Sequence, residues 1–170
     1  MLFETKIDLD EKEQEFIDFV LGNNFPWFFE KTTSEKYMMF GHALMARNKN
    51  NLPETGEVNS TFFDNFQFLF NKVCEKNKIK VNTILRMAIN NTYHSCEKMG
   101  EIHTDHDFPH YNFLWYLNDF TEGSTFIFDE KKEIEIKAEK NKVVIFDGKP
   151  HAQGFCLPHE NRVCFVTTFI

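Results

Sequence analysis

Two histidines and one carboxylate are spaced so that they could hold a metal ion together. His103 and Asp105 stand two positions apart, and on an extended strand side chains at i and i+2 point to the same face. His151 follows the turn-forming segment 146–150 and could supply a third ligand from a later strand. Two imidazoles and one carboxylate suit non-haem Fe(II), because they leave coordination positions open for a co-substrate and dioxygen. The pattern therefore predicts an enzyme.

Zinc is the main competing metal for such a site. A closed structural zinc site takes four protein ligands, usually with cysteine among them. Catalytic zinc sites with two histidines and a carboxylate often begin with a helical His-Glu-x-x-His motif, which this sequence lacks. The four cysteines show no Cys-x-x-Cys pair, so we expect reduced, mostly buried thiols. The sequence therefore favours iron over zinc.

A single arginine follows the distal histidine at a distance that could serve a co-substrate. Arg162 lies eleven residues after His151, in the segment 161–169, whose β-branched and aromatic residues indicate a strand. A guanidinium can hold a carboxylate through two parallel hydrogen bonds. Arg162 is thus a candidate for binding the far carboxylate of a dicarboxylic co-substrate.

From about Thr83 to Ile170 the chain resembles the 2-oxoglutarate and Fe(II)-dependent dioxygenases, and among them the prolyl 4-hydroxylase-like group. Each shared motif is weak alone, and the resemblance rests on their occurring in the family's order. In this sequence the motifs are His103-Thr-Asp105, Phe113-Leu-Trp-Tyr-Leu-Asn118, Gly123-Ser-Thr-Phe126, Val144-Ile-Phe-Asp-Gly148, His151 and Arg162.

This resemblance implies a catalytic iron held by His103, Asp105 and His151, with Arg162 as the 2-oxoglutarate anchor. The expected cofactors are Fe(II), with 2-oxoglutarate and dioxygen as co-substrates, and ascorbate as an optional addition. The implied reaction hydroxylates an unactivated C–H bond and decarboxylates 2-oxoglutarate to succinate. The carboxylate ligand favours hydroxylation, because the related halogenases leave that ligand position vacant for halide.

Two further residues are candidates for co-substrate binding by the same resemblance. Tyr116 matches the tyrosine of the family's Tyr-Leu-Asn strand, and Asn112 is a weaker candidate on the same strand face. Two positions differ from many relatives. Cys164 stands where a serine is frequent, and the segment 84–90 has no tyrosine.

The substrate is left open by the motifs. The resemblance suggests a peptidyl proline or another protein side chain, and a free amino acid or small metabolite is the alternative. A cupin-like metal-binding or isomerase module and a structural interaction domain are readings from other classes. Arg162 argues against a mere metal-binding barrel, which needs no carboxylate anchor.

Composition limits the class of protein. The 170 residues predict one domain, and 21 phenylalanines predict a core rich in aromatic side chains. A net charge of −7 argues against a nucleic-acid partner, since such proteins usually carry a basic stripe. There is no long apolar stretch or leader, so we expect no membrane segment and a cytoplasmic location.

The elements expected to position the site form an α+β, mainly β fold. We predict a helical support region at 1–80, with helices at 10–21 and 61–76, and a jelly-roll (double-stranded β-helix) catalytic core at 81–170. Alternation over 111–118 predicts a cavity face with Asn112 and Tyr116. The predicted strands are 83–90, 101–105, 111–118, 124–128, 133–137, 142–147 and 161–169.

Side chains near the motifs also receive expectations. His106, Asp107 and His110 are expected in a hydrated loop, with substrate contact as the alternative. Arg86 is expected to pair with one of the chain's many acids. His42 is expected at the surface or in a cap.

Overall fold

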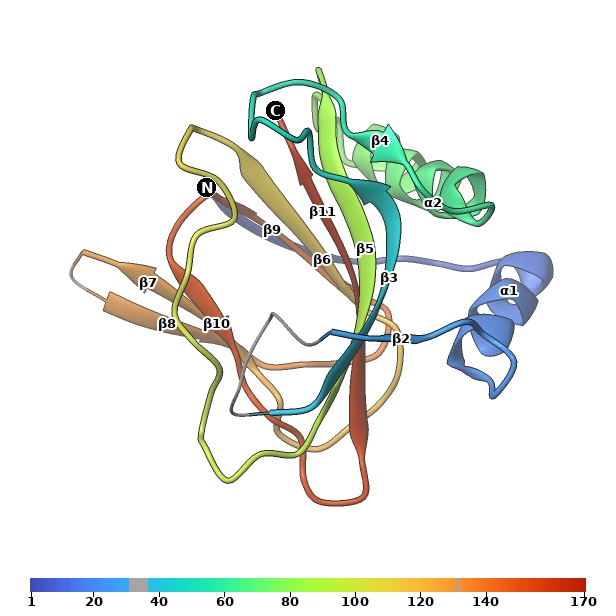
Figure 1. Cartoon of the computed structure of the whole chain (residues 1–170), viewed down its shortest axis with the longest axis vertical. Helices are drawn as coiled ribbons and strands as arrows, with labels where there is room; N and C mark the ends of the chain where they lie inside the picture. Colours follow the sequence, from blue (N-terminus) through green and yellow to red (C-terminus); the bar gives the residue numbers. More distant parts are fainter. Residues whose placement is uncertain (31–36, 131) are drawn as a thin grey trace.

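The computed structural model describes residues 1–30, 37–130 and 132–170, and in this part the chain is mainly β (Figure 1). Two helices are present, α1 (Glu11–Leu21) and α2 (Phe63–Lys76). Helix α1 begins at Asp10, whose side chain accepts from the backbone of Glu13 while the Glu13 side chain accepts from the Asp10 backbone. Both helices lie within two residues of the ranges predicted from the sequence.

The strands form two antiparallel sheets. The larger sheet has eight strands in the order β1-β9-β6-β11-β5-β3-β2, with β4 paired to β3, and the smaller has the order β10-β7-β8. The strands are β1 (Leu2–Lys6), β2 (Phe28–Phe29), β3 (Met39–Ala46), β4 (Glu57–Val58), β5 (Ile84–Tyr93), β6 (Tyr111–Tyr116), β7 (Thr125–Asp129), β8 (Lys132–Ile136), β9 (Lys142–Asp147), β10 (His151–Gln153) and β11 (Asn161–Phe169).

Six of the seven predicted strands are confirmed, and one prediction is wrong. Residues 101–105 do not form a strand, because their only ladder contact is a single bridge between His103 and His151. The first 80 residues also contribute more than helices. Strand β1 pairs with β9 and β3 pairs with β5, so both belong to the large sheet.

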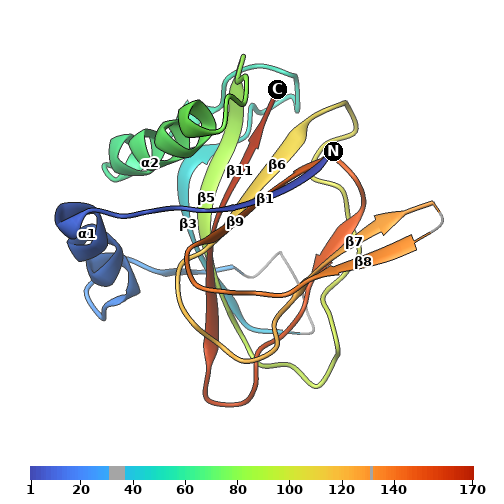
Figure 2. The same ribbon diagram turned by 180° about the vertical axis from the view of Figure 1, so that it is seen from behind.

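The two faces of the large sheet pack against different partners. Helices α1 and α2 lie on one side, and the three-stranded sheet lies on the other (Figure 1, Figure 2). The helical side holds the main core, in which Phe113 and Trp115 of β6 are buried with aromatic residues of α2. The opposite face buries Leu114 and Tyr116 against the small sheet. The alternation predicted for this strand is therefore confirmed, and so is the phenylalanine-rich core.

The cysteines and the helices bear on two other expectations. All four cysteines are free thiols, and only Cys96 is exposed, as the sequence predicted. Neither α1 nor α2, the helices of the described residues, is long and apolar enough to cross a membrane.

Candidate active site

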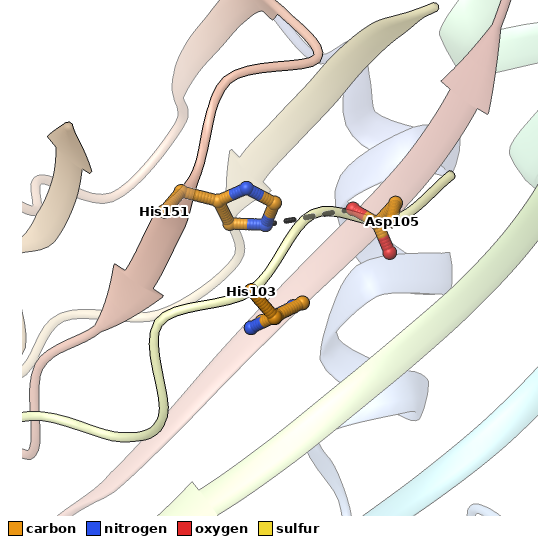
Figure 3. A group of neighbouring side chains, drawn as sticks. All are labelled: His103, Asp105 and His151. Atoms are coloured by element: carbon orange, nitrogen blue, oxygen red, sulfur yellow. Dashed lines mark ion pairs between the residues drawn. The ribbon is translucent and has the colours of Figure 1, made fainter. Parts of the chain in front are cut away.

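The two candidate histidine ligands are brought together by their own backbones. The amide of His103 donates to the carbonyl of His151 at 3.0 Å, and the amide of His151 donates back to the carbonyl of His103 at 2.9 Å. This single antiparallel bridge places the two rings with their centroids 4.6 Å apart. In Figure 3 His151 lies at the start of β10, and His103 and Asp105 lie in the segment before β6.

Hydrogen bonds orient both imidazoles for metal binding. The Nδ1 of His103 lies 3.0 Å from the carbonyl of Glu101, and that of His151 lies 3.0 Å from the carbonyl of Lys149. A carbonyl only accepts, so each Nδ1 carries the proton and each Nε2 keeps a free lone pair. This is the arrangement expected of metal-ligating histidines.

The carboxylate completes a group that could bind iron. Asp105 Oδ2 lies 3.4 Å from His151 Nε2, and the three candidate ligand atoms lie within 4.8 Å of one another. With metal–ligand distances of about 2.1 Å, neighbouring ligand atoms of a six-coordinate ion lie roughly 3 Å apart. To hold an ion, the candidate ligand atoms would therefore move closer to one another by less than about 2 Å.

Charges around the triad favour the protonation states that a metal needs. Burial alone would raise the pKa of Asp105, but the positive charges of Arg86 and Arg47 and the imidazole of His151 hold that pKa below its ordinary value. Burial lowers the pKa of His151. A deprotonated carboxylate and a neutral imidazole are thus available at neutral pH, as ligation requires.

The triad opens into a cavity of about 470 Å³ between the two sheets. Its wall includes residues of β3, β5, β6 and β11 of the large sheet and of β7 and β10 of the small one. Small and apolar side chains, including Ala88, Leu114 and Val166, form part of the wall. The cavity extends from the triad to Arg162, so the predicted metal ligands and the predicted anchor share one space.

Arg162 is a buried cation whose contacts in the cavity are all neutral. The residue is 2% exposed. Its Nε donates to the carbonyl of Gly123 at 3.0 Å, its Nη2 donates to Thr125 Oγ1 at 3.0 Å, and its Nη1 reaches Gln153 Oε1 at 3.5 Å. Among residues 1–30, 37–130 and 132–170, no carboxylate forms an ion pair with it. A buried charge without a counter-ion is costly, so this guanidinium suits an anionic ligand.

Tyr116 packs against Arg162, the candidate anchor. Its ring lies under the guanidinium of Arg162, 5.4 Å from Cζ to the ring centroid, and its hydroxyl lies 2.7 Å from Thr125 Oγ1. Burial raises the pKa of Tyr116 to about 12, so the hydroxyl stays protonated. The cavity wall includes Thr125 but neither Tyr116 nor Asn112, so the prediction that both line the cavity is wrong; of that strand face only Leu114 does so.

Asn112 lies at the other end of the site. It pairs with Thr168 across the β6–β11 ladder, whereas Tyr116 pairs with Cys164, two residues from Arg162. The Asn112 side chain faces a void of about 30 Å³ that Asp105 also lines. Its amide nitrogen and oxygen are buried without a hydrogen-bond partner. The structure therefore places Asn112 near the metal ligands rather than near the anchor.

Two arginines that were not predicted to belong to the site contact Asp105, the candidate carboxylate ligand. Arg47 Nη2 lies 2.6 Å and Arg86 Nη1 lies 3.4 Å from Asp105 Oδ1. Arg86 was expected to pair with an acid and does so, but the acid is the predicted metal ligand. Arg47 follows β3, in a region expected to be helical. The available signal was that the chain has only three arginines, at 47, 86 and 162.

Several expectations for nearby histidines are wrong. His106 and His110 are buried rather than hydrated. The ring nitrogens of His106 lie 3.0 Å from Asn51 Oδ1 and 2.9 Å from Thr168 Oγ1. These hydrogen bonds connect the segment that follows Asp105 to β11. His42 is also buried, with its ring nitrogens against Pro26 and Ser60.

The sequence matches no family model and no curated protein. Solved structures with a similar fold include a 2OG-Fe(II) oxygenase family oxidoreductase from Burkholderia pseudomallei, at 12% identity over 99% of this chain and 84% of that chain, with a TM-score of 0.75. A prolyl hydroxylase from Trichoplax adhaerens, in complex with a hypoxia inducible factor peptide fragment, matches at 10% identity over 99% and 83%, with a TM-score of 0.68. The non-heme alpha-ketoglutarate-dependent epimerase of nogalamycin biosynthesis matches at 10% over 99% and 78%, with a TM-score of 0.65.

At these identities the likeness concerns the fold, and it extends over nearly the whole chain. The resemblance first noted from about Thr83 onward thus includes the helices and strands that precede it. The chain has the fold of the 2-oxoglutarate and Fe(II)-dependent oxygenases, including prolyl hydroxylases, and it carries a His-Asp-His group that could bind iron.

Proposed function

We propose that the protein is a 2-oxoglutarate and Fe(II)-dependent dioxygenase that hydroxylates an unactivated C–H bond. One observation carries the proposal: the buried guanidinium of Arg162, which has no acidic partner among the described residues, shares a cavity with the His103, Asp105 and His151 group. A metal-binding barrel without a co-substrate has no use for such a cation. In this reading residues 1–170 are one catalytic domain whose two sheets form a double-stranded β-helix.

The chain's own residues have distinct tasks in this proposal. His103, Asp105 and His151 would hold Fe(II), which with dioxygen supplies an oxidising power that amino-acid side chains lack. Arg162 and Thr125 would bind the far carboxylate of 2-oxoglutarate.

Other side chains prepare the same site. Tyr116 stacks on the anchor and keeps Thr125 oriented through its hydroxyl. Leu114 and Val166, which pair across β6 and β11, would keep water away from the chain of the co-substrate.

The substrate is a peptide or a small molecule in this proposal. The Trichoplax adhaerens neighbour is a prolyl hydroxylase in complex with a peptide fragment, which supports a peptidyl side chain. The nogalamycin neighbour is an epimerase, so a shared fold does not determine the outcome of the reaction. The identity of the hydroxylated group therefore has to come from the cavity of this chain.

Iron stoichiometry and succinate formation test the proposal. We expect the wild-type protein to bind one Fe(II) per chain and to form succinate from 2-oxoglutarate in air. His103→Ala should lose both properties and keep its circular dichroism spectrum, because an open catalytic site contributes little to folding. His159→Asn is a matched control, since His159 is exposed and Asn tolerates its φ of 73°. Iron retention by His103→Ala would overturn the assignment.

A further inference from the structure

The three arginines of the chain all line one cavity, although the sequence has many more lysines. No lysine among the described residues lines it. Arginine differs from lysine in presenting a planar fork that matches a carboxylate. Arg162 lies at one end and is accounted for by the co-substrate. Arg47 and Arg86 lie together beside Asp105, whose carboxylate they help to keep deprotonated, and the proposed function assigns them no ligand.

The pair carries more positive charge than its one partner can balance. Both guanidinium groups contact the same oxygen of Asp105, while the other oxygen faces His151. Asp105 is also a predicted ligand of a divalent cation, which would draw on the same single negative charge. Glu30 and Glu101 line the cavity too, but neither forms an ion pair with the two arginines among the described residues.

The pair is also accessible to a ligand. The side chains of Arg47 and Arg86 are 38% and 26% exposed, against 11% for Asp105. One guanidinium would be enough to orient the carboxylate, and both retain N–H donors that Asp105 does not use. Excess charge and free donors at a cavity wall are the features of an anion site.

An unpartnered amide, that of Asn112, lies near Arg86. Asn112 is 5% exposed, and neither its nitrogen nor its oxygen has a hydrogen-bond partner. The void that it faces is also lined by Arg86 and Asp105. A buried amide without partners costs free energy unless a ligand or water completes it. Asn112 therefore offers a neutral donor in a small neighbouring void, which shares Arg86 and Asp105 with the cavity wall.

We infer that Arg47 and Arg86, with Asn112 behind them, form a second anion site that binds a carboxylate of the substrate to be oxidised. The inference rests on the proposed function and deepens it by naming the substrate class. A carboxylate held there lies beside the triad and away from Arg162, so co-substrate and substrate would occupy opposite ends of one cavity. The carboxylate could belong to a free acid or to an acidic group of a peptide.

Acetate and its neutral analogue acetamide test the site directly. The Fe(II)-loaded protein is kept without oxygen and saturated with 2-oxoglutarate, and its charge-transfer absorption is recorded first. Each probe is then titrated and followed by saturation transfer to its methyl group in NMR. We expect acetate to bind at least about tenfold more tightly than acetamide, since its hydrogen bonds to the guanidinium groups are charge-assisted.

Variants separate the arginine site from the metal. Arg47→Gln and Arg86→Gln should each reduce the acetate preference about tenfold, and Arg47→Lys should retain part of it. Lys80→Gln, which changes an exposed cation, is the control. Iron content and circular dichroism are measured for each variant, so that loss of metal or fold is seen separately. Equal binding of acetate and acetamide, or acetate binding that survives both glutamine substitutions, would overturn the inference.

A second set of titrations determines whether the carboxylate belongs to a free acid or to a peptide side chain. Free amino acids are compared with their amides, and peptides with an aspartate are compared with the same peptides carrying asparagine. The pair that shows the arginine-dependent preference identifies the source, and no preference in either pair counts against the inference. Absence of the charge-transfer absorption would instead contradict the proposed function, so the two failures are distinguishable.

Discussion

Replacing Arg162 by glutamine should weaken 2-oxoglutarate binding about 100-fold. The Nε of Arg162 donates to Gly123 and one Nη2 hydrogen donates to Thr125, whereas Nη1 makes only a 3.5 Å contact with Gln153. Hydrogens on both Nη atoms are therefore left for the two oxygens of a carboxylate. Two charge-assisted hydrogen bonds of about 1.5 kcal/mol each amount to about 3 kcal/mol, which is roughly 100-fold in affinity.

The assay is calorimetric titration of the anaerobic Fe(II) protein with 2-oxoglutarate. Arg162→Lys, which keeps the charge and loses the fork, should lie between wild type and Arg162→Gln. Thermal unfolding of each variant without ligand shows whether the buried site still folds. A change in affinity of less than roughly threefold in folded Arg162→Gln would refute the assignment of the anchor.

Three further outcomes follow from burial. Phe66→Ala should lower the free energy of unfolding by about 3–5 kcal/mol, because its ring is fully buried against Phe165, and urea denaturation showing a loss below about 1 kcal/mol would contradict the packing. Burial lowers the pKa of His106 to about 4 from 6.5, so the unfolded chain takes up this proton first as the pH falls. In the metal-free protein His106 should thus contribute fully to the free energy of unfolding above pH 6.5. Between pH 6.5 and 4 that free energy should fall by up to about 3 kcal/mol, and a His106→Gln variant with the same pH profile would contradict this. In the native state only Cys96 should react quickly with a thiol reagent, because burial raises the pKa of the other three thiols. More than one fast-reacting thiol per chain would contradict this expectation.

Strands β6 and β11, which carry Tyr116 and the candidate anchor Arg162, were predictable because both are short runs rich in β-branched and aromatic residues. Residues 111–118 separate into two faces that pack on different partners, and 161–169 pairs along almost its whole length with β5 and β6. Both strands are buried along most of their length, and a short apolar run is the pattern that a fully buried strand leaves in a sequence. The candidate metal ligands were also predictable, because their motifs occur along the chain in the order of the family that it resembles.

The missed parts have physical reasons. Strand β3 contains a register shift between Ala43 and Met45, and such a bulge breaks the alternation that marks a strand. Strand β1 is an edge strand whose only partner is β9, so little of it is buried. The bridge between His103 and His151 is one residue long, and a single pairing leaves no periodic pattern. Arg47 was missed because it directly follows β3, and β3 itself was not predicted.

We propose above that one cavity binds a metal through the triad and 2-oxoglutarate through Arg162. The most direct measurement is the visible absorption of the Fe(II)-loaded protein during anaerobic titration with 2-oxoglutarate. We expect a weak charge-transfer band at about 500 nm, because two histidines and a carboxylate leave coordination positions open for the co-substrate. The band should be absent in His103→Ala and should need a higher 2-oxoglutarate concentration in Arg162→Gln. Iron binding without the band at saturating 2-oxoglutarate would contradict the proposal that metal and 2-oxoglutarate share this cavity.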